Sequence, residues 1–110
     1  METNQTTILR AAKIAAKNDG MRQAMTGCIV TKGITALIPL INDIFVRVRD
    51  FNNFTVANDP YGEHDFGSLE IVGIKILWKI DYYDEDLSGW CDPLDPKCRR
   101  QLTIMRADEY

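Results

Sequence analysis

The residues with the most chemical character lie between Asn58 and Asp86. This segment holds the only histidine, His64, and half of the sixteen acidic residues. It begins with the polar run Asn58-Asp59-Pro60-Tyr61-Gly62-Glu63-His64-Asp65 and continues into apolar, strand-like sequence. A loop rich in ionisable groups that leads into strands is typical of a site carried on a sheet. This segment is therefore the first place to look for a site.

The Glu63-His64-Asp65 triplet offers the chemistry of a small hydrolase or a metal-dependent nuclease. A histidine between two carboxylates can act as a general base or as a metal ligand. Adjacent residues of an extended segment point in opposite directions, however, so the three side chains do not converge on one atom. We therefore favour the interpretation that Asp59, His64 and Asp65 satisfy backbone groups and pin the loop to the sheet.

A nuclease site is also a poor match to the acids and lysines that follow. Metal-dependent nucleases place acids and a lysine on neighbouring strands, which directs attention to Asp65, Glu70, Lys75 and Lys79. Glu70 and Lys75 straddle Gly73, so they fit a cross-strand ion pair better than a metal site. No nucleophile motif or phosphate-binding glycine loop occurs. We therefore expect no catalytic residue, no cofactor and no metal, and we favour a role other than catalysis.

Acidic and aromatic residues toward the C-terminus favour a protein-binding role. Residues 1–50 carry seven Lys and Arg against four acids, whereas residues 51–110 carry six against twelve. Nucleic-acid binding requires a basic face, so this acidic half suits a basic protein partner better. Tyrosine and tryptophan are also frequent at binding hot spots. The predicted partner-binding residues are Tyr83, Asp84, Glu85, Asp86, Trp90, Asp92 and Asp95.

Three cysteines, Cys28, Cys91 and Cys98, occur in a chain whose N-terminus lacks the features of a secretion signal. We therefore expect reduced thiols and a cytoplasmic protein. A zinc site is not indicated, because no Cys-x-x-Cys pair occurs and only one histidine is available. No apolar run approaches the roughly 20 residues that span a bilayer, so no membrane association is expected.

Hydrophobic periodicity predicts two helices and four strands. A first helix capped by Thr6 or Thr7 is expected to stop at Asn18-Asp19-Gly20. A short strand over residues 27–31 follows, and apolar residues spaced by three or four predict a second helix over residues 34–50. Further strands are expected over residues 68–72, 74–83 and 100–105. The expected apolar face of the first helix comprises Ile8, Leu9, Ala12, Ala15 and Ala16.

This order of elements predicts a single α+β domain over residues 1–110. Its core is expected to be a small antiparallel sheet of three to four strands with two helices packed on one face. Gly73 marks the turn between the two central strands. In the second of these strands every other residue should face the helices. Those residues are Ile74, Ile76, Trp78, Ile80 and Tyr82.

Several of these motifs resemble a bacterial family of unknown function that occurs in proteobacterial chromosomes and on plasmids. The likeness covers residues 34–110 and rests on Asn58-Asp59-Pro60-x-Gly62-Glu63-His64-Asp65-Phe66-Gly67, Trp78-Lys79-Ile80-Asp81-Tyr82-Tyr83-Asp84 and Leu102-Thr103-Ile104-Met105. The resemblance implies no activity, catalytic residue or cofactor. It implies an association with mobile elements, whose small proteins often inhibit host defence. The most specific function we expect is therefore a mobile-element or phage inhibitor, anti-CRISPR-like, that occupies a basic surface of a nucleic-acid-processing or CRISPR effector complex.

Overall fold

The β-hairpin that the alternating sequence predicts is present, but it lies on one side of the sheet rather than at its centre, because its first strand is an edge strand. The computed structural model describes the backbone of residues 2–110 and the side chains of residues 6–110. Strand β2 (Phe66–Ile71) pairs antiparallel with β3 (Ile74–Tyr83). Val72 and Gly73 connect them with φ values of 50° and 78°. A two-residue turn with both φ values positive matches the twist of the strands, and glycine adopts this conformation without steric cost.

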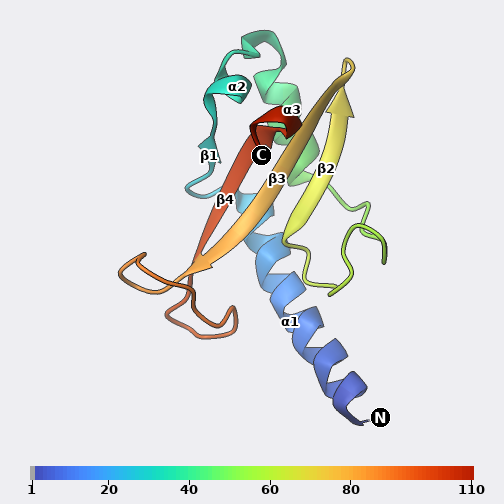
Figure 1. Ribbon diagram of the computed structural model, residues 1–110, viewed down its shortest axis with the longest axis vertical. Coiled ribbons are helices and arrows are strands. Elements are labelled where there is room, and N and C mark those ends of the chain that lie inside the picture. Colours follow the sequence, from blue (N-terminus) through green and yellow to red (C-terminus); the bar gives the residue numbers. More distant parts are fainter. Residues whose placement is uncertain (1) are drawn as a thin grey trace.

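Two further strands complete the sheet on the other side of β3 (Figure 1). Strand β4 (Arg99–Arg106) is antiparallel to β3, and the short strand β1 (Ile29–Val30) pairs with β4. The order is β1-β4-β3-β2. The predicted α+β class is confirmed. The sheet is mixed rather than wholly antiparallel, because the chain passes through helices and the hairpin before β4 returns parallel to β1.

Helix α1 (Glu2–Ala24) is longer than predicted. The expected stop at Gly20 is wrong: the helix continues to Ala24, and the left-handed conformation occurs later, at Met25 and Gly27. Its expected apolar face is also wrong: Ile8 and Leu9 are 67% and 60% exposed, Ala12 and Ala16 are exposed, and of the five residues only Ala15 is buried. Among residues 6–24 of α1, the buried ones are Ile14, Ala15, Asn18 and Arg22. Two polar residues lie on this face because the folded chain supplies their hydrogen-bond partners, which a hydrophobicity pattern does not detect.

The predicted helix over residues 34–50 is divided into three pieces. These are α2 (Lys32–Thr35), the 3₁₀ turn η1 (Ile38–Leu40) and α3 (Ile41–Arg49). Pro39 lies in η1, where its missing N–H interrupts a continuous α-helical ladder. The apolar stripe still packs on the sheet through buried Ile34, Ile44 and Val48.

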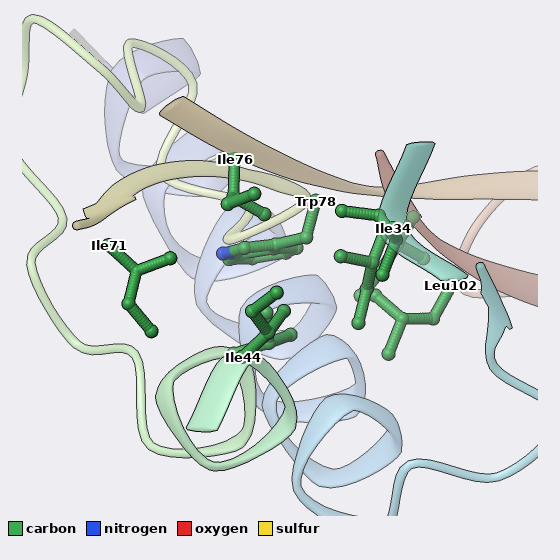
Figure 2. Packing of buried hydrophobic residues seen from close by; sticks show 9 residues of the cluster. Ile34, Ile44, Ile71, Ile76, Trp78 and Leu102 are labelled. Atoms are coloured by element: carbon green, nitrogen blue, oxygen red, sulfur yellow. The ribbon is translucent and has the colours of Figure 1, made fainter. Parts of the chain in front are cut away.

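Helices α1 and α3 both cover the same face of the sheet, as predicted (Figure 1). Trp78 of β3 lies fully buried at the centre of the core, between Ile76 of its own strand and Ile44 of α3 (Figure 2). A Cβ atom at Gly67 would overlap the Trp78 indole, so the neighbouring strand must carry glycine there. The fully and nearly buried core comprises Ile34, Ile44, Val48, Ile71, Ile76, Trp78, Ile80, Leu102 and Ile104.

The chain ends with the 3₁₀ turn η2 (Ala107–Glu109), which lies close to β3. The Glu109 carboxylate accepts hydrogen bonds from the Thr31 hydroxyl at 2.6 Å and from the Gly33 backbone at 3.0 Å. These contacts attach the C-terminus to the start of α2. None of the helices within residues 2–110 combines the length and the apolarity that crossing a membrane requires.

Candidate functional site

His64 lies in the loop between α3 and β2 and reaches across to α1. Its Nδ1 atom is 3.0 Å from Oδ1 of Asp19, and its Nε2 atom is 3.6 Å from Oδ2 of Asp59. The backbone N–H of His64 also donates to the Asp59 carboxylate at 3.3 Å. The imidazole is stacked on Phe54, with ring centroids 3.8 Å apart and planes inclined by 3°. The ring is therefore fixed on three sides.

A second layer of contacts joins this histidine to α3. Arg22, one helical turn after Asp19, donates to the same Asp19 carboxylate at 2.8 Å. Its other terminal nitrogen donates to the carbonyl groups of Val48 and Arg49 at the end of α3, at 3.2 and 3.0 Å, and the Val48 carbonyl also accepts from the Phe51 backbone. The Asp19 carboxylate contacts His64 and Arg22, and Arg22 contacts α3, so this chain of contacts connects the loop, α1 and α3.

The predicted Glu63-His64-Asp65 triplet does not form a catalytic cluster. No hydrogen bond or ion pair joins the His64 ring to Glu63 or Asp65 within residues 6–110. The partners of the ring are Asp19 and Asp59 instead. Glu70 lies opposite Lys75 in the hairpin register, but the predicted cross-strand ion pair between them is wrong, because none forms among the described side chains. In the same part of the chain, no group of three or more His, Cys, Asp and Glu could hold a metal ion.

A groove of about 750 Å³ lies between α1 and the loop that carries His64. The helix contributes small side chains such as Ala11 and Ala15, and the loop contributes exposed Tyr61. Glu63 also lines the groove; burial, with the nearby Asp65 charge, raises the pKa of its carboxyl group. A groove of this size with a few polar groups is large enough for a small ligand.

Replacing His64 is expected to lower the free energy of unfolding by about 1–3 kcal/mol, because Asp19 and Asp59 lose a shared partner. His64→Asn is the suitable variant, since asparagine tolerates the φ of 57° that His64 adopts. Urea denaturation at pH 7 measures the change. An unchanged stability would contradict this clamping role and favour an acid–base role for the imidazole.

The acidic loop (residues 84–98) follows β3 and begins with a tight turn organised by Asp84. The Asp84 carboxylate accepts hydrogen bonds from the Ser88 backbone at 3.0 Å and hydroxyl at 3.2 Å. These bonds, that from the Ser88 backbone foremost, lower the pKa of Asp84. The Asp84 backbone N–H donates to the Gly89 carbonyl at 2.8 Å, which closes the turn. Asp84, predicted to contact a partner, therefore shapes the loop.

Asp92 and Asp95 organise the second half of the acidic loop. Asp92 accepts from the Leu94 backbone at 2.9 Å and from Arg10 of α1 at 2.6 Å, and these bonds, that from the Leu94 backbone foremost, lower its pKa. Asp95 accepts from the Lys97 backbone at 2.9 Å. Both carboxylates thus have local partners, and Arg10 attaches the loop to α1.

A disulfide between Cys91 and Cys98 closes this part of the loop. The expectation of three reduced thiols is therefore wrong, and only Cys28 is free among the described cysteines. The physical reason lies in two consecutive turns, in which the Asp95 and Cys98 backbone N–H groups donate to the Asp92 and Asp95 carbonyls. They fold the segment back and bring the two cysteine Cα atoms to 5.8 Å, within the range that a disulfide spans.

The remaining predicted partner residues are those that the loop leaves available. Trp90 is 71% exposed, although tryptophan usually buries most of its surface. Glu85 and Asp86 are exposed, and their carboxylates make no ion pair with any described side chain. Tyr83 is half-buried beside them at the end of β3. In the acidic loop, some predicted partner residues therefore shape the turns, whereas Glu85, Asp86 and Trp90 face solvent.

A polar network that sequence analysis missed supports this end of the molecule. The Asn18 side-chain amide donates to the Tyr82 hydroxyl at 2.8 Å and to the Glu63 carbonyl at 2.9 Å. Arg100 donates to the Asn18 side-chain oxygen at 2.6 Å and to the Pro93 carbonyl at 2.6 Å. Burial raises the pKa of Tyr82 to about 12. The network joins α1, the His64 loop, the sheet and the acidic loop.

Asn18, Asp19 and Arg10 were not predicted as site residues. The Asn18-Asp19-Gly20 run predicts a helix stop, and that interpretation assigns no contact to the Asn18 and Asp19 side chains. A usable signal was present, because Asp19 and Arg22 are spaced by three residues and therefore lie on one helix face. Their partners on the loop are distant in sequence, so no local pattern identifies them.

Comparison with known proteins gives a family without an assigned activity. Residues 30–109 match the model of a family described as "Protein of unknown function (DUF3768)". The matched range contains the His64 loop, the hairpin and the acidic loop. No curated protein and no solved structure matches the chain.

Proposed function

The chain belongs to the DUF3768 family of proteins of unknown function, and from its geometry we propose that it is an interaction module that binds a basic protein surface through the acidic loop. The observation that carries this proposal is the exposed Trp90 in the same loop as Glu85 and Asp86, whose carboxylates form no ion pair with the side chains of residues 6–110. An aromatic anchor with adjacent charge is the composition of a binding hot spot.

The rigidity of the acidic loop also supports binding. The Cys91–Cys98 disulfide, the Asp84 turn and the Arg10–Asp92 ion pair all restrain it before any partner arrives. A loop that is already ordered loses less conformational entropy on binding. The excess of acids in residues 51–110 favours encounter with a basic surface, and it disfavours direct binding to nucleic acid.

The most specific form of the proposal concerns defence systems. The motif resemblance to bacterial, plasmid-borne proteins favours a mobile-element or phage inhibitor that acts, anti-CRISPR-like, on a host complex. Such complexes hold nucleic acid in basic channels, and carboxylates on a rigid loop can take the place of phosphates there. A CRISPR effector is one such complex in the cytoplasm, where the Asp84 turn and the Arg10–Asp92 ion pair would still order the loop if the Cys91–Cys98 disulfide were reduced.

Affinity capture from a host lysate, followed by competition with nucleic acid, tests this proposal. The double variant Glu85→Gln/Asp86→Asn is expected to retain the captured partner about 10-fold less well, which corresponds to about 1.4 kcal/mol. The loss should arise mainly in the association rate and should shrink at high salt.

The matched control is Asp43→Asn/Glu70→Gln. It removes the same charge from exposed residues on α3 and the hairpin, away from the acidic loop. This control should leave capture unchanged. A partner that is indifferent to both variants and still binds nucleic acid in the presence of the protein would contradict the proposal.

A small hydrolase is the second candidate function, and the Asp19–His64 pair favours it. A carboxylate at Nδ1 orients an imidazole for general-base catalysis, and the adjacent groove offers space for a substrate. The Asp59 carboxylate near Nε2 and the stacking on Phe54 favour a clamp instead. The His64→Asn measurement distinguishes the two roles.

A further inference from the structure

A hollow of about 440 Å³ lies beside the acidic loop, where β3 extends past the start of β2 and is paired only with β4. The last pair of the hairpin register joins Phe66 to Lys79, and β3 extends beyond it to Tyr83. Asp65, just before β2, and Asp81 of β3 line the hollow, which the acidic loop borders with Trp90.

Two carboxylates in this hollow differ in how they are compensated. The Asp65 side chain pairs with no Lys or Arg among residues 6–110, and burial raises the pKa of its carboxyl group. Asp81 pairs with Lys79 of the same strand at 2.9 Å. A partly buried carboxylate without a cation destabilises the free protein, and a cation supplied from outside would remove that penalty.

Aromatic and apolar side chains form the other walls of the hollow. Tyr83 and Trp90 contribute ring surface, and exposed Leu87 adds an apolar wall. A guanidinium group stacks on such rings and donates to carboxylates from a planar fork of five N–H groups, whereas an ammonium group is a compact point charge. A hollow lined by two carboxylates and by the Tyr83 and Trp90 rings therefore matches arginine in both charge and shape.

We propose that this hollow receives an arginine side chain from the basic partner, with Asp65 and Asp81 binding the guanidinium group and Trp90 covering it. The inference rests on the proposed function, and it identifies the group of the basic partner that binds beside the acidic loop as an arginine guanidinium. Glu85 and Asp86, exposed on the acidic loop, then attract the basic surface, while the hollow binds one residue of it.

Titration with the capped tripeptide acetyl-Gly-Arg-Gly-amide, followed by NMR, tests the inference without the partner protein. The Trp90 indole N–H and the backbone amides of Asp65 and Asp81 should shift in a saturable way. The buried Trp78 indole serves as an internal control and should not move. The peptide with citrulline in place of arginine has nearly the same shape without the charge, and it should bind at least 10-fold more weakly.

Three variants assign the binding to the hollow. Asp65→Asn should weaken arginine binding about 10-fold, while Lys79→Gln should strengthen it several-fold by releasing Asp81. Glu70 lies near the hairpin turn, at the opposite end of the register from Asp65, so Glu70→Gln should leave arginine binding unchanged. Thermal unfolding keeps this test interpretable: Asp65→Asn removes an uncompensated charge, so its melting temperature at pH 7 should equal or exceed that of the wild type.

The possible failures are distinguishable. Equal binding of the citrulline peptide, or unchanged arginine binding in Asp65→Asn, would overturn the assignment of the hollow. If Glu85→Gln/Asp86→Asn still loses the captured partner in that case, the proposed function survives without the hollow. If neither Glu85→Gln/Asp86→Asn nor Asp65→Asn affects capture of the partner, both proposals are wrong.

Discussion

Replacing Arg22 with alanine is expected to lower the free energy of unfolding by about 3–5 kcal/mol, the range found when one member of a buried ion pair is removed. Arg22 is only 1% exposed and lies 5.0 Å from the Trp78 ring centroid. Its loss removes the donor to two carbonyl groups at the end of α3 and leaves the Asp19 carboxylate with His64 alone. Urea denaturation monitored by circular dichroism measures the effect.

Arg49→Ala is the matched control for this prediction. Arg49 forms an exposed ion pair with Asp50 at 2.8 Å, and such pairs contribute at most about 1 kcal/mol. Arg22→Met retains most of the buried volume without the donors, so it should fall between the two if Arg22→Ala does not fold. Equal stabilities of the Arg22 and Arg49 variants would show that the buried network does not hold α1 to α3.

Replacing Trp78 with alanine is expected to cost about 3–5 kcal/mol, as for other large-to-alanine changes in cores. Trp78 is fully buried and contacts both layers: Phe51 packs edge-on at 5.4 Å between ring centroids, and Ile44 of α3 lies against it (Figure 2). The cavity left by the indole has no side chain free to fill it, since Gly67 opposite has none.

Trp90→Ala provides the control within the same chain. Trp90 lines the hollow and is exposed, so its loss should change the free energy of unfolding by less than about 0.5 kcal/mol. Thermal unfolding of the two variants side by side makes the comparison. A large loss of stability in Trp90→Ala would show that this residue belongs to the core of the acidic loop and would contradict its role as a partner contact.

The β2–β3 hairpin was predictable because its determinants are local. Alternating residues in β3 place Ile76, Trp78 and Ile80 on one face, and all three are buried there. Gly73 marks the turn because its positive φ is easily adopted by glycine. Side chains two residues apart share a face of any strand, so this pattern needs no knowledge of the rest of the fold.

The end of α1 shows where local signals fail. The Asn18-Asp19-Gly20 sequence favours a helix stop when it is considered alone. In the folded chain Asn18 binds Tyr82 and Arg100, and Asp19 binds His64, so the helix continues through all three residues. These hydrogen bonds outweigh the helix propensity of a single glycine, which costs about 1 kcal/mol.

The candidate sites divide in the same way. The sequence alone determined that the ionisable residues gather around His64 and along the acidic loop, because composition and turn-forming residues are visible in it. Only the tertiary structure decided which of them meet. Asp19 and His64 are 45 residues apart, and Asp92 and Arg10 are 82 apart. Contacts at such separations form only when helix and sheet pack, so their pairing depends on the geometry of the whole core rather than on neighbouring residues.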